Sequence, residues 1–253
     1  MRDNFRKKEK DEDFIFGIHP VLEALKAGKP FEKLLLQTPF ESAGIKEVIK
    51  LSKENNIEYK SVPAIVLDRL TTKNHQGVIA YLSPVEFYDL EEIVTSVFEK
   101  GKDPLILILD KITDVRNFGA IARTAECFGV DAILVPNQGG ARIGSDAIKT
   151  SAGALLKIPI CKSANLKLSL LLLQQLGFKI GAATEKSTSI CYQQDLSGPL
   201  ALIMGSEELG VSKEYLKLSS HSLRIPLVGE IASLNVSVAA GILLYEIHKQ
   251  RTI

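Results

Sequence analysis

The chain has 253 residues, of which 45% are apolar and 24% are charged. Such a composition excludes disorder, collagen and coiled coil as the dominant state, and it can fill one large core or two smaller ones. The 31 basic and 30 acidic residues leave a formal net charge of +1, which excludes a strongly basic protein that coats polyanions. A local basic surface remains compatible with this balance.

Cysteine usage and the N-terminus indicate the cellular compartment. Cys127, Cys161 and Cys191 are widely spaced without a CxxC motif, so we expect no disulfide framework and no zinc site, but a reducing compartment. Residues 1–13 mix five basic with five acidic residues and lack the apolar core of a signal peptide. No apolar run is long enough to span a bilayer. The sequence therefore predicts a soluble, cytoplasmic protein without a membrane partner.

The first third of the chain predicts a small domain behind a tail. Residues 1–13 are expected to be a flexible, solvated tail, because so charge-dense a stretch buries little apolar area. Strand-like and helix-like patterns then alternate as far as residue 82. Strands are expected at residues 14–18, 33–37, 58–62 and 77–82, and helices at residues 20–26 and 45–54. This alternation predicts a small α/β domain over residues 14–82.

Residues 83–103 interrupt the pattern. Pro84, a polar stretch and the run from Gly101 to Pro104 flank one short amphipathic segment with acidic residues at Glu91 and Glu92, so we expect a linker there. From residue 104 to residue 253, short apolar runs typical of a parallel sheet alternate with helical stretches. The expected strands are residues 105–109, 132–135, 178–183, 200–204 and 223–227, and the expected helices are residues 117–128, 145–155, 166–176 and about 234–250. The second domain is thus predicted to be a parallel α/β sheet with ligands at the carboxyl ends of its strands.

Several common catalytic motifs are missing from the sequence. No GxGxxG follows a predicted strand, and the glycines at positions 205 and 210 are not followed by the lysine of a phosphate loop, which argues against dinucleotide binding and nucleotide hydrolysis. GxSxG and HExxH are absent as well. No metal site is expected, because the histidines show no ligand spacing; they are His19, His75, His221 and His248.

Three other segments each follow a predicted strand, and each has a purely structural interpretation. Asn117 can cap the helix that carries Arg123, Glu207 can lie at a helix N-terminus between two glycines, and the segment 225–241 can cap the last helix. Three such segments at the ends of strands in one sheet nevertheless indicate a common site, because the carboxyl ends of parallel strands share one edge.

These segments resemble the three motifs of the SpoU branch of the SPOUT methyltransferases, which transfer a methyl group from S-adenosylmethionine to a ribose 2′-hydroxyl in RNA. The match runs over about residues 105–250, with NxGxxxR at Asn117 to Arg123, GxExxG at Gly205 to Gly210, and IPL…SLNVSVAAG at Ile225 to Gly241. Residues 17–25 and 74–80 resemble the N-terminal substrate-binding domain of bacterial large-subunit rRNA guanosine 2′-O-methyltransferases, although His19 stands where asparagine is common.

The resemblance implies a C-terminal domain tied into a deep trefoil knot, a smaller RNA-binding N-terminal domain, and a homodimer formed through the knotted region. It also implies S-adenosylmethionine as the cofactor, held largely through backbone groups. The implied cofactor-binding residues are Met204, Gly205, Gly210, Ile225, Leu227 and Leu234.

The resemblance implies catalytic roles for a polar set, namely Asn117, Arg123, Glu207, Ser233 and Asn235. A guanidinium group does not normally lose its proton in a protein, so we interpret Arg123 as the anchor of an RNA phosphate rather than as the base. In this interpretation the phosphate next to the target ribose takes the proton. Arg116, Arg142 and Lys149 lie near loops that follow strands and are candidate RNA-phosphate contacts, although a solvated surface charge is the commoner role for such residues.

Three functions stay open at this point. The favoured one is 2′-O-methylation of a guanosine in 23S rRNA, with the first domain gripping the RNA. The second keeps the chemistry but changes the substrate to tRNA, and the N-terminal domain argues against it because tRNA enzymes of this branch usually lack that domain. The third is an RNA-binding assembly factor without turnover, against which the intact polar set argues.

Overall fold

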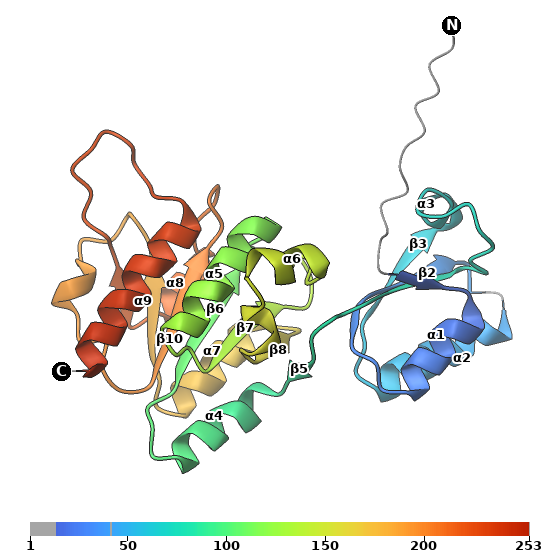
Figure 1. Cartoon of the computed structure of the whole chain (residues 1–253), viewed down its shortest axis with the longest axis horizontal. Helices are drawn as coiled ribbons and strands as arrows, with labels where there is room; N and C mark the ends of the chain where they lie inside the picture. The colour runs from blue at the N-terminus through green and yellow to red at the C-terminus, as the bar shows by residue number, and fades with distance from the viewer. Residues whose placement is uncertain (1–13, 41, 253) are drawn as a thin grey trace, which may run out of the picture. The chain divides into compact units, whose positions relative to one another are not determined.

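The computed structural model describes residues 14–40 and 42–252, and the predicted tail lies outside the described residues. The chain forms two compact units that divide between Pro84 and Val85 (Figure 1). No helix within the described residues combines the length and the apolar character needed to cross a membrane.

The smaller unit is a four-stranded sheet with helices on both faces. Its elements are β1 (Phe14–Phe16), α1 (Ile18–Lys26), β2 (Phe31–Thr38), α2 (Ala43–Glu54), β3 (Tyr59–Pro63), α3 (Ala64–Asp68) and β4 (Val78–Leu82). The strand order is β1-β4-β2-β3; β4 pairs antiparallel with β1 and β2, and β2 pairs parallel with β3. The expected strands and helices of this unit are present, with ends shifted by a few residues. The sequence did not predict α3, because five residues show little more than one helical turn.

Two cores follow from the alternation of side chains along β2. Leu34 and Leu36 point to one face, where α1 and α2 cover them, whereas Leu35 points to the other face and packs against Leu67 of α3. Ser42 caps the start of α2, and its Oγ accepts the Ile45 N–H at 3.1 Å.

Much of the segment that we expected to be a linker belongs to the larger unit. It forms β5 (Phe87–Tyr88), which pairs parallel with β8 (Ile160–Ser163), and α4 (Leu90–Glu99). One side of α4 is apolar and buried, and the polar residues that suggested a linker lie on its exposed side. An amphipathic helix therefore accounts for the composition of this segment.

The larger unit is a seven-stranded sheet in the order β11-β9-β10-β6-β7-β8-β5, in which every neighbouring pair is parallel. The strands not yet given are β6 (Leu105–Asp110), β7 (Ala132–Pro136), β9 (Lys179–Ala183), β10 (Leu200–Gly205) and β11 (His221–Leu223). The predicted parallel α/β architecture is thus confirmed. The central strands β6 and β10 are buried along their whole length, as expected for a sheet covered on both faces.

Helices form a layer on each face of this sheet (Figure 1). On one face lie α5 (Val115–Cys127), α6 (Ser145–Thr150) and α9 (Val236–Thr252); on the other lie α4, α7 (Leu166–Gln175) and α8 (Lys213–Leu218). The helix expected at residues 145–155 breaks into α6 and the short 3-10 helix η1 (Ala154–Leu156), between which Ala152 and Gly153 have positive φ.

The predicted strand at residues 223–227 is wrong. The strand β11 ends at Leu223, and residues 225–235 form no helix or strand before α9 begins. Pro226 has no N–H to donate to a neighbouring strand. Residues 225–228 are apolar, which is why a strand was predicted, but no strand in the described chain lies beside them to pair with. The sequence also did not predict β5 and β8.

Candidate active site

Two neighbouring strands bring the first two polar segments to one edge of the sheet. Gly205 at the end of β10 pairs in register with Asp110 at the end of β6. The chain that follows β11, residues 224–235, leads to the start of α9, which packs on the same face as α5. The three segments after β6, β10 and β11 therefore meet where the sequence analysis expected a site.

Three polar side chains from these segments form one hydrogen-bonded cluster, which we call the polar triad: Asn117, Glu207 and Asn235. Glu207 Oε1 accepts from Asn117 Nδ2 at 3.1 Å and from Asn235 Nδ2 at 2.5 Å. Asn235 Nδ2 also donates to Asn117 Oδ1 at 3.0 Å. Each residue thus contacts both others, although all three are at least partly exposed to solvent. The triad keeps donor and acceptor positions that are not used within it, so a ligand can hydrogen-bond to it.

Asn117 is free for this cluster because another residue caps α5. Asp114 is the N-cap, and its Oδ1 accepts the Asn117 backbone N–H at 2.8 Å. The interpretation of Asn117 as the helix cap is therefore wrong, and its side chain is left to reach Glu207. An aspartate directly before the helical pattern was the signal that could have identified the cap.

The capping interpretation does hold at the start of α9. Asn235 Oδ1 accepts the Ser237 N–H at 2.9 Å, and Glu207 Oε1 lies 3.4 Å from the Val236 N. The N-terminal end of a helix carries a partial positive charge, which favours the Glu207 carboxylate at this position. The triad and the cap of α9 consequently share Asn235 and Glu207, so a change in one alters the other.

The loop after β10 is held tightly against the sheet. A Cβ added to Gly205 would lie 2.1 Å from the Gly210 carbonyl carbon and from the Val211 N, so no larger residue fits without a shift of the loop. The Gly210 N–H donates to the Ser206 carbonyl at 2.8 Å. Glu207 is therefore presented by a compact turn whose geometry depends on Gly205.

Asp110 fastens the other end of this loop, and the sequence analysis missed it. Asp110 is 1% exposed, and its Oδ2 accepts the Ser212 N–H at 2.7 Å. Lys111 Nζ adds a contact to Ser212 Oγ at 3.2 Å. A charged residue at the end of an otherwise apolar strand was the available signal, because a buried carboxylate requires a hydrogen-bond donor.

The main chain of residues 225–234 is open to a ligand. Within the described part of the chain, no backbone N–H or carbonyl of this segment makes a hydrogen bond to another residue. Ile225 and Leu234 are half-buried, whereas Leu227 is exposed. Free backbone groups next to partly buried apolar side chains fit a cofactor that is held mainly by the main chain.

The remaining candidate cofactor residues lie at the base of this region. Gly205 and Met204 are buried at the end of β10, so they can contact a ligand mainly through backbone groups. Gly210 has a positive φ in the turn that carries Glu207. No three His, Cys, Asp or Glu side chains within residues 14–40 and 42–252 form a group that could hold a metal.

Two predicted catalytic residues do not join the polar triad. Arg123 is exposed on α5, six residues after Asn117 and therefore about 120° around the helix from it. Its guanidinium makes no ion pair or hydrogen bond with any described residue. Ser233 is exposed in the segment before α9. Both side chains are accessible to a substrate.

The three candidate phosphate contacts surround the start of α5. Arg116 is exposed in the first turn of α5, Arg142 is half-buried in the loop after β7, and Lys149 is exposed in the last turn of α6. The Ala141 N–H in that loop donates to the Ile112 carbonyl at 2.7 Å, which joins the loops that follow β6 and β7. The three cations thus belong to the same edge of the sheet as the triad.

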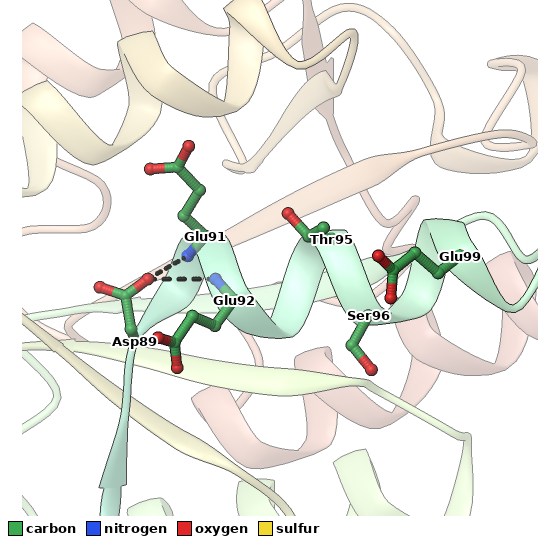
Figure 2. Close-up of a pocket in the computed structure, with 6 residues that line it drawn as sticks. All are labelled: Asp89, Glu91, Glu92, Thr95, Ser96 and Glu99. Carbon is green, nitrogen blue, oxygen red and sulfur yellow. Dashed lines mark hydrogen bonds between the residues drawn. The ribbon is translucent and has the colours of Figure 1, made fainter.

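An acidic hollow lies on α4 (Figure 2). This helix packs on the opposite face of the sheet from α5 and α9. It has a volume of about 480 Å³, and four carboxylates line it together with two hydroxyls; the residues are Asp89, Glu91, Glu92, Thr95, Ser96 and Glu99. Asp89 also caps α4, accepting the N–H groups of Glu91 and Glu92. Such a surface repels RNA phosphates, so we assign it no part in substrate binding.

Comparison with protein families decides the identity of both units. Residues 104–245 match the model of the SpoU rRNA Methylase family, and residues 14–88 match the model of the RNA 2′-O ribose methyltransferase substrate-binding domain. The chain belongs to the SpoU methylase family. It is therefore an RNA methyltransferase, with a family-specific substrate-binding domain in front of the methylase domain.

Individual relatives of this SpoU-family protein agree with the assignment. A Staphylococcus saprophyticus protein named, without a firm assignment, as a TrmH family tRNA/rRNA methyltransferase is 35% identical over 95% of this chain and 97% of its own length. An AdoMet-bound rRNA methyltransferase from Sinorhizobium meliloti shares the fold, with a TM-score of 0.59, 22% identity and coverage of 93% and 86% of the two chains. The A. aeolicus TrmH/SpoU tRNA modifying enzyme is 32% identical, with a TM-score of 0.55, over 64% of this chain and 84% of its own.

Proposed function

We propose that this SpoU-family enzyme transfers a methyl group from S-adenosylmethionine to the ribose 2′-hydroxyl of a guanosine in 23S rRNA. The observation that carries the proposal is the polar triad, which lies at the start of α9 beside a segment with free backbone groups. A structural cap needs one polar side chain, whereas here three from distant segments converge at one point. S-adenosylmethionine supplies, when bound, a methyl group already activated by its sulfonium.

Glu207 is the residue placed to meet the ribose. Its Oε1 receives three N–H donors, from Asn117, Asn235 and Val236, while its Oε2 makes no hydrogen bond within the described residues. Oε2 is thus the carboxylate oxygen that remains available to the substrate, and the three donors fix the direction in which it points. Orientation of this kind supplies a large part of the rate gain when the reacting carbon is already activated.

Arg123 has the role of an electrostatic anchor in this proposal. A guanidinium offers two parallel N–H groups that match two phosphate oxygens, and it does not normally act as a base. Its exposed position lets it hold the phosphate next to the target ribose, which takes the hydroxyl proton. Arg116, Arg142 and Lys149 hold more distant phosphates, and Ser233 with Asn235 orients the sugar.

The backbone groups of residues 225–234, with those of Met204, Gly205 and Gly210, form the cofactor site in this proposal. The residues present fit a ligand held by main-chain hydrogen bonds and apolar contacts, since no described residue hydrogen-bonds to the backbone of residues 225–234. The trefoil knot implied by the resemblance belongs to the same proposal, because threading the chain here would hold these segments together.

The choice of rRNA over tRNA rests on the substrate-binding domain. The aligned tRNA modifying enzyme covers 64% of this chain, whereas the aligned rRNA methyltransferase covers 93%. A domain of about the size of the smaller unit is thus shared with the latter and supports an rRNA substrate. Methylation of tRNA is the alternative, because the curated relative is named for both.

Radiolabel transfer from S-adenosylmethionine tests the proposal. We expect the purified enzyme to label 23S rRNA taken from a strain that lacks the gene, and not rRNA from the parent strain, whose site is already methylated. Labelling of tRNA alone would select the alternative. Transfer to no RNA at all, by protein that binds RNA, would instead favour a non-catalytic assembly factor.

We infer further that the enzyme is a cytoplasmic homodimer. Val238, Ile242 and Tyr245 are 39–58% exposed and recur at intervals of four and three residues, so they form an apolar stripe on α9. Exposed Val228 and Ile231 lie in the segment before this helix. A second copy of the chain can cover such a stripe.

Light scattering during gel filtration tests this inference. We expect the unaltered enzyme to give twice the mass of one chain, and a Tyr245→Glu variant to give the mass of a single chain.

A further inference from the structure

The two faces of the sheet in the smaller unit are covered differently. α1 and α2 pack across one face, whereas on the other face the short helix α3 packs mainly on β2 and β3. The β1 and β4 end of that face instead carries Phe14, Phe16 and Tyr81. Phe14 pairs in register with Tyr81, and their ring centroids are 5.5 Å apart; the Phe14 and Phe16 centroids are 6.1 Å apart.

Two lysines flank these aromatic rings. The Lys33 ammonium lies 5.9 Å from the centroid of Tyr81, and the Lys73 ammonium lies 6.0 Å from the centroid of Phe16. Both lysines are exposed. Among the described residues neither forms an ion pair, whereas Lys26 and Lys50 on the other side of this sheet pair with glutamates one helical turn away. The charges of Lys33 and Lys73 are thus available to an anion.

The rings themselves are accessible to different degrees. Phe14 and Phe16 are half-buried, and Tyr81 is 7% exposed, so Tyr81 supports the surface while the two phenylalanines present part of their rings to solvent. Aromatic rings interleaved with cations are the surface to which single-stranded nucleic acid binds, because bases stack on the rings and phosphates meet the cations.

We propose that Phe14, Phe16, Lys33 and Lys73 bind an unpaired segment of the RNA substrate, with a base against Phe16 and the flanking phosphates at the two lysines. We call these four residues the aromatic–lysine face. The identity of the bound RNA in this inference rests on the proposed function. The binding itself does not depend on methyl transfer, because the face belongs to the smaller unit and the polar triad to the larger one. The charge pattern favours RNA over an apolar protein partner, which would leave two ammonium groups without compensation.

Tryptophan fluorescence gives a direct readout of stacking. The chain contains no tryptophan, so Phe16→Trp creates a single fluorophore on the aromatic–lysine face. We expect titration of the full-length variant with a short unpaired RNA to quench this fluorescence to saturation. Phe98→Trp is the matched control, since Phe98 is 38% exposed, packs edge-on against Phe178 and lies on α4 in the larger unit. Equal quenching of both variants, or of neither, would overturn the proposal.

A second pair of variants tests the phosphate contacts without altering the rings. Lys33→Gln with Lys73→Gln should reduce the salt dependence of RNA binding by about 1.4 in the log–log slope, because each lost contact with single-stranded RNA removes about 0.7. Lys46→Gln with Lys53→Gln is the control, since these exposed lysines of α2 lie on the other side of the sheet. An unchanged slope in the first double variant, or an equal change in the control, would contradict the proposal.

Methyl transfer measured on the same proteins separates this inference from the proposed function. If the unaltered enzyme methylates RNA but Phe16→Trp is not quenched and the slope stays constant, the aromatic–lysine face is wrong and the proposed function stands. If the unaltered enzyme transfers no methyl group while Phe16→Trp alone is quenched, the binding face stands and the proposed function fails. Thermal unfolding of each variant confirms that the smaller unit remains folded.

Discussion

Asn117 and Asn235 are 118 positions apart in the chain, and the amide nitrogen of Asn235 donates to the amide oxygen of Asn117 at 3.0 Å. Glu207 accepts from both amides at a single carboxylate oxygen. Two amides and one carboxylate therefore hydrogen-bond to one another, which fixes their orientation before any substrate arrives. Such preorganisation is what an enzyme requires when its task is to aim a hydroxyl at an activated carbon.

Removal of the Asn235 side chain should reduce activity far more than stability. We expect Asn235→Ala to lower kcat about 100-fold, since it removes a donor to Glu207, and to lower the free energy of unfolding by about 1 kcal/mol through loss of the cap of α9. Asn165→Ala is the matched control, because Asn165 caps α7 in the same way but lies outside the site. Equal losses of activity in the two variants would show that the triad has only a capping role.

A methyl group at position 205 should disturb the loop that presents Glu207. Gly205→Ala places a Cβ against the backbone of Gly210 and Val211, so the loop must shift, and we expect about tenfold weaker S-adenosylmethionine binding and a loss of about 1–3 kcal/mol in stability. Calorimetric titration measures the first effect and chemical denaturation the second. Gly140→Ala serves as control, because its nearest neighbour would be 3.8 Å away. Unchanged affinity in Gly205→Ala would mean that the cofactor does not depend on this loop.

The charge of Arg123 alone should not sustain catalysis. Arg123→Lys keeps the charge but loses the planar pair of N–H donors, so we expect kcat to fall about 100-fold while the affinity for S-adenosylmethionine stays the same. Steady-state kinetics combined with calorimetry separate the two quantities. Arg69→Lys, a change at another exposed arginine, should leave both unchanged. Near-full turnover by Arg123→Lys would rule out both a phosphate anchor and a base at this position.

The three cysteines should differ in reactivity. Cys127 is exposed, whereas burial, together with the nearby Asp89 carboxylate, raises the pKa of Cys161 to about 12, and burial also raises the pKa of Cys191. A raised pKa leaves less thiolate at any pH below it, so at pH 8 an alkylating reagent should label one thiol per folded chain and three after unfolding. Mass spectrometry of the labelled peptides, with Cys127→Ser as the control that takes up no label when folded, checks this. Rapid labelling of Cys161 in the folded protein would contradict its burial.

Local patterns in the sequence were sufficient for most of the elements and for the class of fold. Runs such as residues 105–109 are apolar at every position, which only a strand buried on both faces requires, and they correctly indicated a parallel sheet. The motifs around Asn117, Glu207 and Asn235 indicated that three segments after strands meet, and the structure joins these three side chains by hydrogen bonds. In each case neighbouring residues carry the signal, so no knowledge of distant contacts was needed.

Only the tertiary structure decided which polar residues act together and how. Asn117 was open to interpretation as a cap until Asp114 was found in that position, and the role of Asp110 depends on Ser212, which lies 102 positions further along the chain. Residues 225–227 have the composition of a strand, yet no neighbouring strand among the described residues pairs with them. Hydrogen bonds between distant segments depend on how the sheet places its strand ends. The sequence therefore determined most of the elements and their candidate residues, whereas the packing of the sheet determined the partners of these residues.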